Sequence, residues 1–497
     1  MRIGFLLRFF GRLHLLLAAL FLIPMLVGLA CGERTIWAYL GPSLGLVALG
    51  LASVRWARRH PLHDGEGIRR REGFVLVSFS WLLTIFYGSL PYLFSGSIDS
   101  VVDAIFEAAS GFTTTGATVL TNIEALDHGI LFWRSFSQWL GGMGIIVLSV
   151  AILPELAIGG MQLMSAESTG LGVDKLAPRI AETAKRLWVL YAVLTLVEVV
   201  LLVAGPMDLF EAVTHAFATT ATGGFSPKNA SIGHYDSAYV DTVITVFMFL
   251  AGTNFALQYR VFVRREGSKL FTSSEFRLYT AIAVCVTLLV TLNLYVANYK
   301  EKYQSLGECL HYGGFQVVSI LTTTGFGTAD FDAWPIFSKS LIVILMTIGG
   351  CAGSTAGGLK IIRLVVVLKH AGREFRRLIY PRMVKPIMVD GKAIDDEILW
   401  SMLGFFLLYM LSFLATLILL TCLPHAREMD MDLETATTAS LSALNSIGPG
   451  LGGVGPSQNF AFVHPFGKLA LSFCMVLGRL EIYTLLIIFA PRFWRRQ

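Results

Sequence analysis

The sequence predicts an all-α polytopic membrane protein, with two N-terminal helices followed by four parallel repeats of span, short helix, loop and span around a common axis. The composition is the first reason, because 55% of the 497 residues are hydrophobic and only 15% are charged, whereas roughly 25% of a soluble protein is charged. The second reason is that the apolar residues form runs that can cross a bilayer, which takes about 20 residues of helix. The third is a Thr/Gly segment that recurs between these runs.

Ten apolar runs are candidate membrane-spanning helices. They lie near residues 13–30, 36–54, 73–95, 131–153, 187–206, 238–260, 275–297, 336–367, 398–423 and 465–490. The first run follows a few charged residues, as in a signal peptide, but its apolar core is long for one. We therefore expect an uncleaved first span rather than a leader that is removed.

Basic residues are concentrated in alternate connecting segments, and this bias predicts the orientation of the chain. The segments after the second, sixth and eighth spans and the C-terminal tail are rich in Arg and Lys, whereas residues 97–130 contain acidic residues and neither Arg nor Lys. Basic loops of membrane proteins stay in the cytoplasm. We therefore expect both termini to be cytoplasmic. The excess of Arg and Lys in these cytoplasmic segments next to the lipid bilayer also explains the pI of about 8.8. The basic character of the chain therefore does not require a nucleic-acid partner.

Four short Thr/Gly segments lie between apolar runs on the predicted outer side. They read SGFTTTG (110–116), FATTATG (217–223), SILTTTG (319–325) and SALNSIG (442–448). Each follows a short helix-compatible stretch with an acidic residue near its start. An even number of crossings separates the copies, so all four point the same way, whereas inverted-repeat transporters need opposite orientations. The parallel copies therefore predict a ring around a central pore.

These copies divide the chain into five units. We expect a two-span N-terminal unit at 1–71, pore repeat 1 at 72–160, pore repeat 2 at 161–266, pore repeat 3 at 267–392 and pore repeat 4 at 393–497. A pore helix of about ten residues is roughly 15 Å long, so it reaches the middle of the bilayer and places its loop there.

The composition of the four loops suits the binding of a monovalent cation. Irregular backbone at membrane depth is tolerated where it is buried in protein or lines water, and convergent backbone carbonyls can replace the hydration shell of an ion. Divalent cations favour carboxylate ligands, and none of the four segments contains Asp or Glu. The predicted filter residues are Thr114, Thr115, Gly116, Ala221, Thr222, Gly223, Thr323, Thr324, Gly325, Asn445, Ser446, Ile447 and Gly448.

Two features of the last apolar runs predict irregular structure below the four loops. The eighth apolar run is interrupted by small residues, which cannot hold a stable lipid-facing helix; a small-residue packing face is the alternative. The last run contains Arg479 and Glu481, and charges at membrane depth face a partner or water, so a structural pair of these two is also open. The residues at these two features are Gly349, Gly350, Gly353, Ser354, Thr355, Gly357, Gly358 and Arg479. Their role as a gate is an expectation that follows from the resemblance described next.

Four motifs give the chain a resemblance to a known family over essentially its whole length. They are SGFTTTGAT (110–118), TATGGFS (220–226), LTTTGFGTAD (321–330) and NSIGPGLGGVGP (445–456). With them the chain resembles the membrane subunits of the bacterial Trk potassium-uptake system, in the superfamily that also includes Ktr and plant HKT transporters. In that superfamily a glycine at the filter position of every repeat accompanies potassium, so the resemblance implies K+ as the transported ion.

The resemblance also implies properties that the residues alone do not show. It implies that the intramembrane loop obstructs the permeation path and that Arg479 lies beside it as an electrostatic barrier to cations. It further implies a homodimer in the bacterial cytoplasmic (inner) membrane, and a cytosolic, nucleotide-binding Trk regulatory subunit as partner.

Other functions are less consistent with the sequence. A sodium- or proton-coupled alternating-access symporter of monovalent cations remains the alternative, although the parallel repeats and the lack of a midplane carboxylate cluster argue against it. An enzyme would need convergent Asp, His or Cys side chains, and the six scattered cysteines form no CxxC pair. We therefore expect no enzymatic activity and no cofactor bound by the chain itself. His215, in the second pore helix, is expected to be a packing residue.

Overall fold

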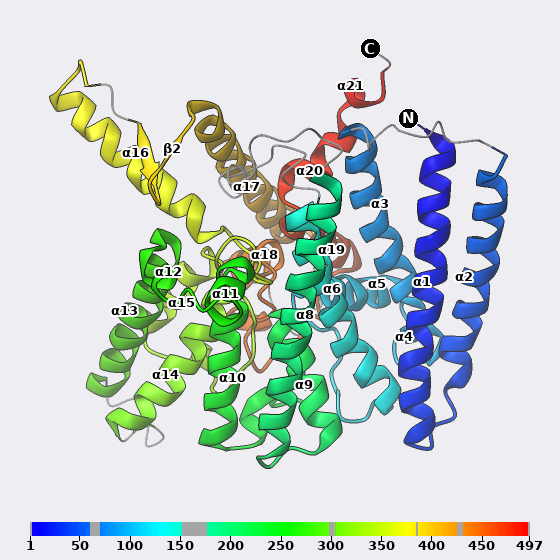
Figure 1. The fold of residues 1–497 in the computed structure, drawn as a ribbon. Helices are drawn as coiled ribbons and strands as arrows, with labels where there is room; N and C mark the ends of the chain where they lie inside the picture. Colours follow the sequence, from blue (N-terminus) through cyan, green and yellow to red (C-terminus); the bar gives the residue numbers. More distant parts are fainter. Residues whose placement is uncertain are drawn as a thin grey trace.

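The computed structural model describes residues 2–59, 70–151, 176–297, 303, 305–383, 386–424 and 431–495, and these residues are mostly helical (Figure 1). The first half contains α1 (Ile3–Ala30), α2 (Ile36–Ala57), α3 (Arg70–Gly88), α4 (Leu90–Phe94), α5 (Val101–Phe112), α6 (His128–Ala151), α8 (Leu176–Val203), α9 (Leu209–Ala221), α10 (Ala238–Ala251), α11 (Phe255–Phe262) and α12 (Ser268–Thr272).

The second half contains α13 (Ser274–Val296), α14 (Leu306–Leu321), α15 (Ile336–Met346), α16 (Ile361–Ile379), the antiparallel hairpin of β1 (Ile387–Val389) and β2 (Lys392–Ile394), α17 (Asp396–Cys422), α18 (Leu433–Asn445), α19 (Pro465–Arg479), α20 (Ile482–Leu486) and α21 (Pro491–Trp494). The described residues also include four 3₁₀ turns, η3 (Ser231–His234), η4 (Phe331–Ala333), η5 (Gly452–Val454) and η6 (Ile487–Phe489).

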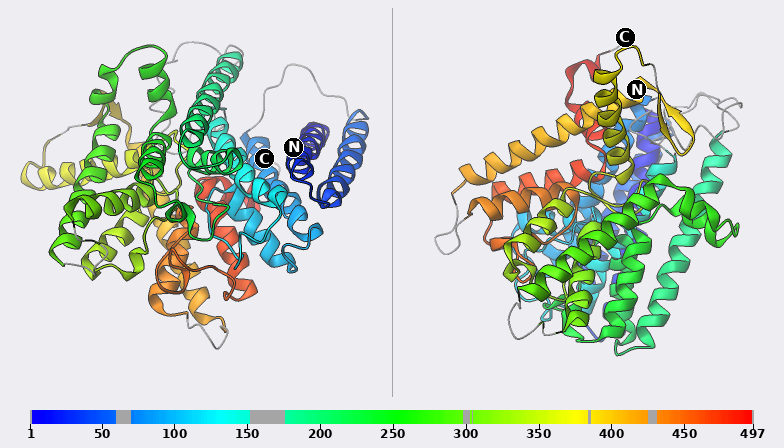
Figure 2. Two further views of the ribbon diagram at one scale, coloured as in Figure 1. Left: turned by 90° about the horizontal axis from the view of Figure 1, so that it is seen from below. Right: turned by 90° about the vertical axis from the view of Figure 1, so that its left-hand side faces the viewer.

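The helices surround a common centre, with the chain running once around it. Seen from below, α5 and α6 are followed in order around the centre by the segments coloured green, yellow and orange to red (Figure 2). Helices α1 and α2 pack against each other outside this ring (Figure 1). Small residues let them approach closely, because a methyl group added at Gly11 would lie 3.0 Å from the carbonyl oxygen of Gly50.

Both chain ends lie on one face of the molecule, here called the terminal face (Figure 1). Helix α16 also extends toward this face and projects beyond the helices around it. The placement of both termini on one side agrees with the even number of predicted crossings. The boundary expected at residues 160 and 161 falls outside the described part of the chain.

The long apolar helices confirm a multi-pass membrane protein, with two corrections. Among the described residues, six helices are long and apolar enough to cross a membrane, or eight if two bent pairs each count as one span. The predicted continuous span at 238–260 is wrong, because α10 and α11 meet at 107°. Asn254 starts α11 as a new helix by accepting hydrogen bonds from the amides of Ala256 and Leu257 at 2.8 and 3.1 Å.

The predicted continuous span at 465–490 is also wrong. Helix α19 ends at Arg479, and the following helical segment is bent by 117° relative to it. The break lies at Leu480 and Glu481, where Glu481 has a φ of 59° that a right-handed helix cannot contain. The predicted interruption of the run at 336–367 is present, since α15 ends at Met346 and α16 begins at Ile361.

The four predicted short helices are α5, α9, α14 and α18, and each begins with the same device. The side chain of the N-cap residue accepts a hydrogen bond from the backbone amide three residues later. This satisfies one of the free amides at a helix start. The N-cap residues are Ser100, Asp208, Ser305 and Asp432. In all four helices an acidic residue in the first turn is well placed at the positive end of the helix dipole.

Candidate ion path

Each of the four short helices ends in a loop with the same backbone conformation. One residue with a side chain adopts a φ between 54° and 57°, and a glycine two residues later has a φ between 76° and 102°. The amide between these two positions donates to a carbonyl five residues earlier, in the last turn of the helix. The matched triplets are Thr114–Gly116, Thr222–Gly224, Thr323–Gly325 and Ser446–Gly448.

The second triplet differs by one residue from the predicted set of Ala221, Thr222 and Gly223. Ala221 is the last residue of α9, and Gly224 occupies the place that Gly116 has in the first loop. The two consecutive glycines of TATGGF make either alignment possible from the Thr/Gly pattern alone. A usable signal was the next residue, because Gly224–Phe225 matches Gly325–Phe326 in the third loop, and both phenylalanines are buried.

The four triplet glycines place the loops in a closed ring. A methyl group added at any of them would collide with a backbone carbonyl oxygen of the next loop. Gly116 faces the carbonyl of Gly223, Gly224 that of Thr324, Gly325 that of Ile447, and Gly448 that of Thr115. The loops of the first, second, third and fourth copies therefore meet in that order, and the fourth closes on the first.

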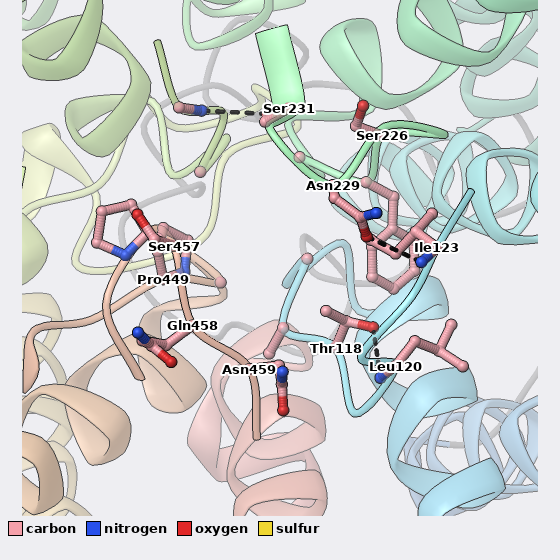
Figure 3. A pocket seen from close by; sticks show the side chains of 18 of the residues that line it. Thr118, Leu120, Ile123, Ser226, Asn229, Ser231, Pro449, Ser457, Gln458 and Asn459 are labelled. Carbon is pink, nitrogen blue, oxygen red and sulfur yellow. Dashed lines mark hydrogen bonds between the residues drawn. The ribbon is translucent and has the colours of Figure 1, made fainter. Parts of the chain in front are cut away.

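Hydrogen bonds between the segments that follow the loops repeat this order, and Figure 3 draws the one between Ile123 and Asn229. Each links one copy to the next, and the last returns to the first. The pairs are Ile123 N with Asn229 Oδ1 at 2.9 Å, Gly327 N with Ser231 Oγ at 3.2 Å, Gly452 N with Asp332 Oδ2 at 3.1 Å, and Phe460 N with Thr118 O at 2.8 Å. These segments line a cavity of about 150 Å³ that also touches the four triplet glycines.

Buried side chains support the loops from behind. In the first loop the hydroxyls of Thr113 and Thr115 are hydrogen-bonded at 2.7 Å, and Thr322 and Thr324 make the same pair in the third. The second loop is supported by Gln138 of α6, whose amide group donates to Gly223 O at 2.6 Å and accepts from Phe225 N at 3.1 Å. These anchors hold the strained left-handed turns in place.

A buried ion pair links the first two loops. Arg134 of α6 donates to Glu107 of α5 at 3.0 Å and to the carbonyl oxygen of Ser226 at 3.1 Å, and its guanidinium lies over the ring of Phe225. Glu107 in turn accepts from the amide of Val119. Sequence analysis assigned no role to Arg134, Glu107 or Gln138, although a buried charge at membrane depth is itself a signal.

His215 is a packing residue of the second short helix. Its two ring nitrogens lie 2.8 Å from the carbonyl oxygen of Glu211 and 3.0 Å from the hydroxyl of Ser226, and the residue is fully buried. Both nitrogens are therefore used within the protein, as the sequence analysis expected of a structural histidine.

The interrupted run forms a compact loop, residues 347–360, directly beneath two of the triplets. We call it the intramembrane loop. Its two arms touch, because a methyl group at Gly349 would collide with the carbonyl oxygen of Gly357. The amide of Gly357 donates to the hydroxyl of Thr323 at 2.7 Å, and Gly357 also packs against the carbonyl oxygen of Asn445. The loop thus contacts the third copy at its triplet and the fourth copy at Asn445, the residue before its triplet.

Side chains from other helices hold the intramembrane loop. Arg479 of α19 is buried and donates to the carbonyl oxygen of Thr355 at 2.6 Å. The hydroxyl of Thr355 donates to the carbonyl oxygens of Thr220 and Ala251 at 3.0 and 3.2 Å. Glu481 pairs with Arg363 of α16, so the structural pair of Arg479 with Glu481 that the sequence left open is not formed.

The parallel copies, the closed ring of loops and the long apolar helices define a multi-pass membrane protein of the cation-transporting class. A family described as TrkH, cation transport protein, matches residues 45–496. The chain belongs to this TrkH family, and the expected resemblance is confirmed. The family consists of transport proteins, so the prediction that the chain is not an enzyme is confirmed as well.

Individual relatives match the chain from end to end. It is 40% identical over 490 residues to the Trk system potassium uptake protein TrkH of Escherichia coli (strain K12), covering 98% of both chains. It is 37% identical over 501 residues to the protein of the same name from Halomonas elongata, covering 100% of both. The crystal structure of the potassium transporter TrkH from Vibrio parahaemolyticus superposes with a TM-score of 0.88 at 38% identity, covering 100% of both chains.

Proposed function

We propose that this protein takes up potassium ions across the bacterial cytoplasmic membrane through a filter formed by the four triplets. The observation that carries the proposal is the closed ring of loops with one shared conformation, placed at the C-terminal ends of four short helices. Those helix ends carry partial negative charge and favour a cation between them. The named relatives are potassium uptake proteins, which supports K+ as the ion.

The polar groups of the ring suit a monovalent ion. The buried hydroxyls of Thr114 and Ser446 have no hydrogen-bond partner in the described part of the chain, so they are free to contact an ion. The residues lining the cavity include neither Asp nor Glu. Arg134 and Lys228, which also line it, are paired with Glu107 and Glu211. Carbonyl and hydroxyl oxygens without carboxylates favour a monovalent over a divalent cation.

The intramembrane loop acts as the gate of this path. Its contacts with Thr323 and Asn445 put it immediately beyond the ring, and Arg479 adds a buried positive charge beside it. A cation leaving the filter would meet both obstacles. Opening therefore requires the loop to leave its position beneath the third and fourth triplets.

The terminal face is the cytoplasmic one in this proposal. Helix α16 and its hairpin extend from this face and carry several Arg and Lys residues, as cytoplasmic segments do. Their projecting position offers a surface to a cytosolic, nucleotide-binding Trk regulatory subunit. A homodimer completes the proposed assembly, and no cofactor is bound by the chain itself.

Complementation of a bacterium that lacks potassium uptake tests the function. The wild-type chain is expected to restore growth at low external K+. The Gly116→Ser variant is expected to lower the K+/Na+ flux ratio in proteoliposomes, because its side chain would be forced against the carbonyl of Gly223. Unchanged selectivity would show that the ring is not the filter. Transport driven only by a proton or sodium gradient would instead favour the coupled symporter.

A further inference from the structure

The N-terminal end of α13 places a carboxylate against the intramembrane loop. Glu275 is the second residue of this helix and is 7% exposed. Its Oε1 atom accepts a hydrogen bond from the amide of Ala352 at 2.7 Å and another from the amide of Ile362 at 3.1 Å. Ala352 lies in the middle of the loop, and Ile362 lies in the first turn of α16. One oxygen atom therefore connects the loop to the helix that follows it.

This contact differs from the backbone contacts that hold the loop. The amide of Phe255 donates to the carbonyl oxygen of Gly353, and the amide of Cys351 donates to the carbonyl oxygen of Gly252. A side-chain substitution does not remove these backbone hydrogen bonds directly. Glu275 instead accepts both hydrogen bonds with a side-chain oxygen, so a substitution at this position acts on the contact directly. If the loop moved away, the buried carboxyl group of Glu275 would lose the two hydrogen bonds that offset the free-energy cost of its burial. The loop and Glu275 are therefore most stable together, in the position seen in the structure.

We infer that Glu275 is a positioning residue that latches the intramembrane loop in the position blocking the ion path. This inference rests on the proposed function, since it assigns a latch to the proposed gate. Opening the gate separates Ala352 from Oε1. Weakening this hydrogen bond favours the open loop without changing the filter, whose triplets Glu275 does not contact through any hydrogen bond described for it.

A native cysteine of the loop provides a direct measurement of its release. Cys351 is adjacent to Ala352, carries a free thiol and is 1% exposed. In a full-length chain that keeps only this cysteine, the rate of reaction with a small cationic methanethiosulfonate reports how often the loop leaves its site. The other five cysteines, replaced in this background, are Cys31, Cys285, Cys309, Cys422 and Cys474.

The variants are compared in proteoliposomes for Cys351 labelling, Rb+ uptake and K+/Na+ selectivity. Glu275→Gln keeps the shape of the side chain but replaces the carboxyl group by an amide, whose oxygen is a weaker acceptor than a carboxylate, and we expect labelling to become about tenfold faster, equivalent to about 1.4 kcal/mol. Glu275→Ala is expected to exceed this. Glu72→Gln is the matched control, because Glu72 is a buried carboxylate of α3 that accepts a hydrogen bond from the backbone amide of Arg2; its labelling rate should stay at the wild-type value.

The two measurements separate failure of the latch from failure of the gate. Faster labelling of Cys351 with faster Rb+ uptake and unchanged selectivity supports both the latch role of Glu275 and the gating role of the loop. Faster labelling with unchanged uptake supports the latch and contradicts the gating role of the loop. Labelling of Glu275→Gln and Glu275→Ala at the wild-type rate overturns the inference, whatever the uptake. Glu275→Gln retains the size of the native side chain and is expected to fold as wild type does. Gel filtration checks this before either measurement.

Discussion

Single residues decide how the second loop joins the ring. Gly223 and Gly224 are chemically identical, but their backbones are not, since only Gly224 has the positive φ shared by Gly116, Gly325 and Gly448. A side chain at Gly224 would collide with the carbonyl of Thr324 in the neighbouring loop. At Gly223 it would collide instead with the side chain of Gln138. The closed ring therefore requires a glycine at Gly224, which the Thr/Gly pattern alone did not identify.

We predict that Gly224→Ser lowers the K+/Na+ selectivity of uptake, as is expected for Gly116→Ser. The serine side chain would require a strained φ of 76° and would displace the backbone of the third loop. Ion flux through proteoliposomes measures the ratio. Gly41→Ala in α2 is the control, because an added methyl group there meets no atom within 4 Å. Full selectivity of Gly224→Ser would contradict the alignment of the four triplets.

The intramembrane loop shows how one element combines local sequence with distant contacts. Its glycines allow the two arms to touch at Gly349 and Gly357, which explains why the apolar run cannot continue as a helix. Its position, however, is set by Thr323, Glu275 and Arg479, which lie on other helices. A loop held by a few side chains can leave its site when those contacts weaken, as an element that gates a path must.

We predict that Arg479→Ala increases K+ flux. The substitution removes both the positive charge and the hydrogen bond to Thr355, and a buried hydrogen bond of a charged group contributes about 1.5–3 kcal/mol. Rb+ uptake into proteoliposomes measures the change. Arg479→Lys should lie between wild type and Arg479→Ala, because lysine keeps the charge but not the guanidinium geometry. Flux at the wild-type rate, with regulation intact, would exclude Arg479 from the gate.

At the scale of the whole molecule, polar pairs join neighbouring copies around the ring. Asp241 of α10 pairs with His311 of α14 at 2.7 Å, and Lys339 of α15 pairs with Glu434 of α18 at 2.9 Å. The boundary between α6 and α9 is aromatic instead, with Phe132 and Phe136 against Phe217. Lys468 of α19 closes the ring by pairing with Asp103 of α5 at 2.7 Å. The closure joins residues from the two halves of the chain.

We predict that the Lys468–Asp103 pair stabilises the fold more than the Lys339–Glu434 pair. The Lys468 and Asp103 side chains are 4% and 26% exposed, whereas Lys339 and Glu434 are 21% and 43% exposed, so the first pair is the more buried one. Double-mutant cycles with Lys→Met and acid→amide substitutions, followed by thermal unfolding in detergent, measure the coupling. We expect about 1–3 kcal/mol for the buried pair and about 0–1 kcal/mol for the exposed one. Equal couplings would show that burial does not set the strength of ring closure.

The sequence by itself determined the class of protein, the four parallel copies, the short helices and the site of the interrupted span. These features depend on local hydropathy, helix-start residues and glycine content, which are readable within each copy. The five-unit division and the role of the triplets as a filter remain predictions. The sequence did not show the bends at Gly252–Asn254 and Leu480–Glu481, because the polar residues at both breaks lie within runs that are apolar on average and long enough to be taken as one span.

Only the tertiary structure decided the alignment of the second loop, the order of the ring and the contacts of the intramembrane loop. Each depends on residues far apart in the chain, as in the approach of Gly448 to Thr115 or of Glu275 to Ala352. The physical reason is that a glycine's conformation, or a buried carboxylate's partner, is fixed by neighbouring elements rather than by adjacent residues. The local sequence pattern therefore specifies the helices and loops, and packing around the common centre specifies the contacts between them.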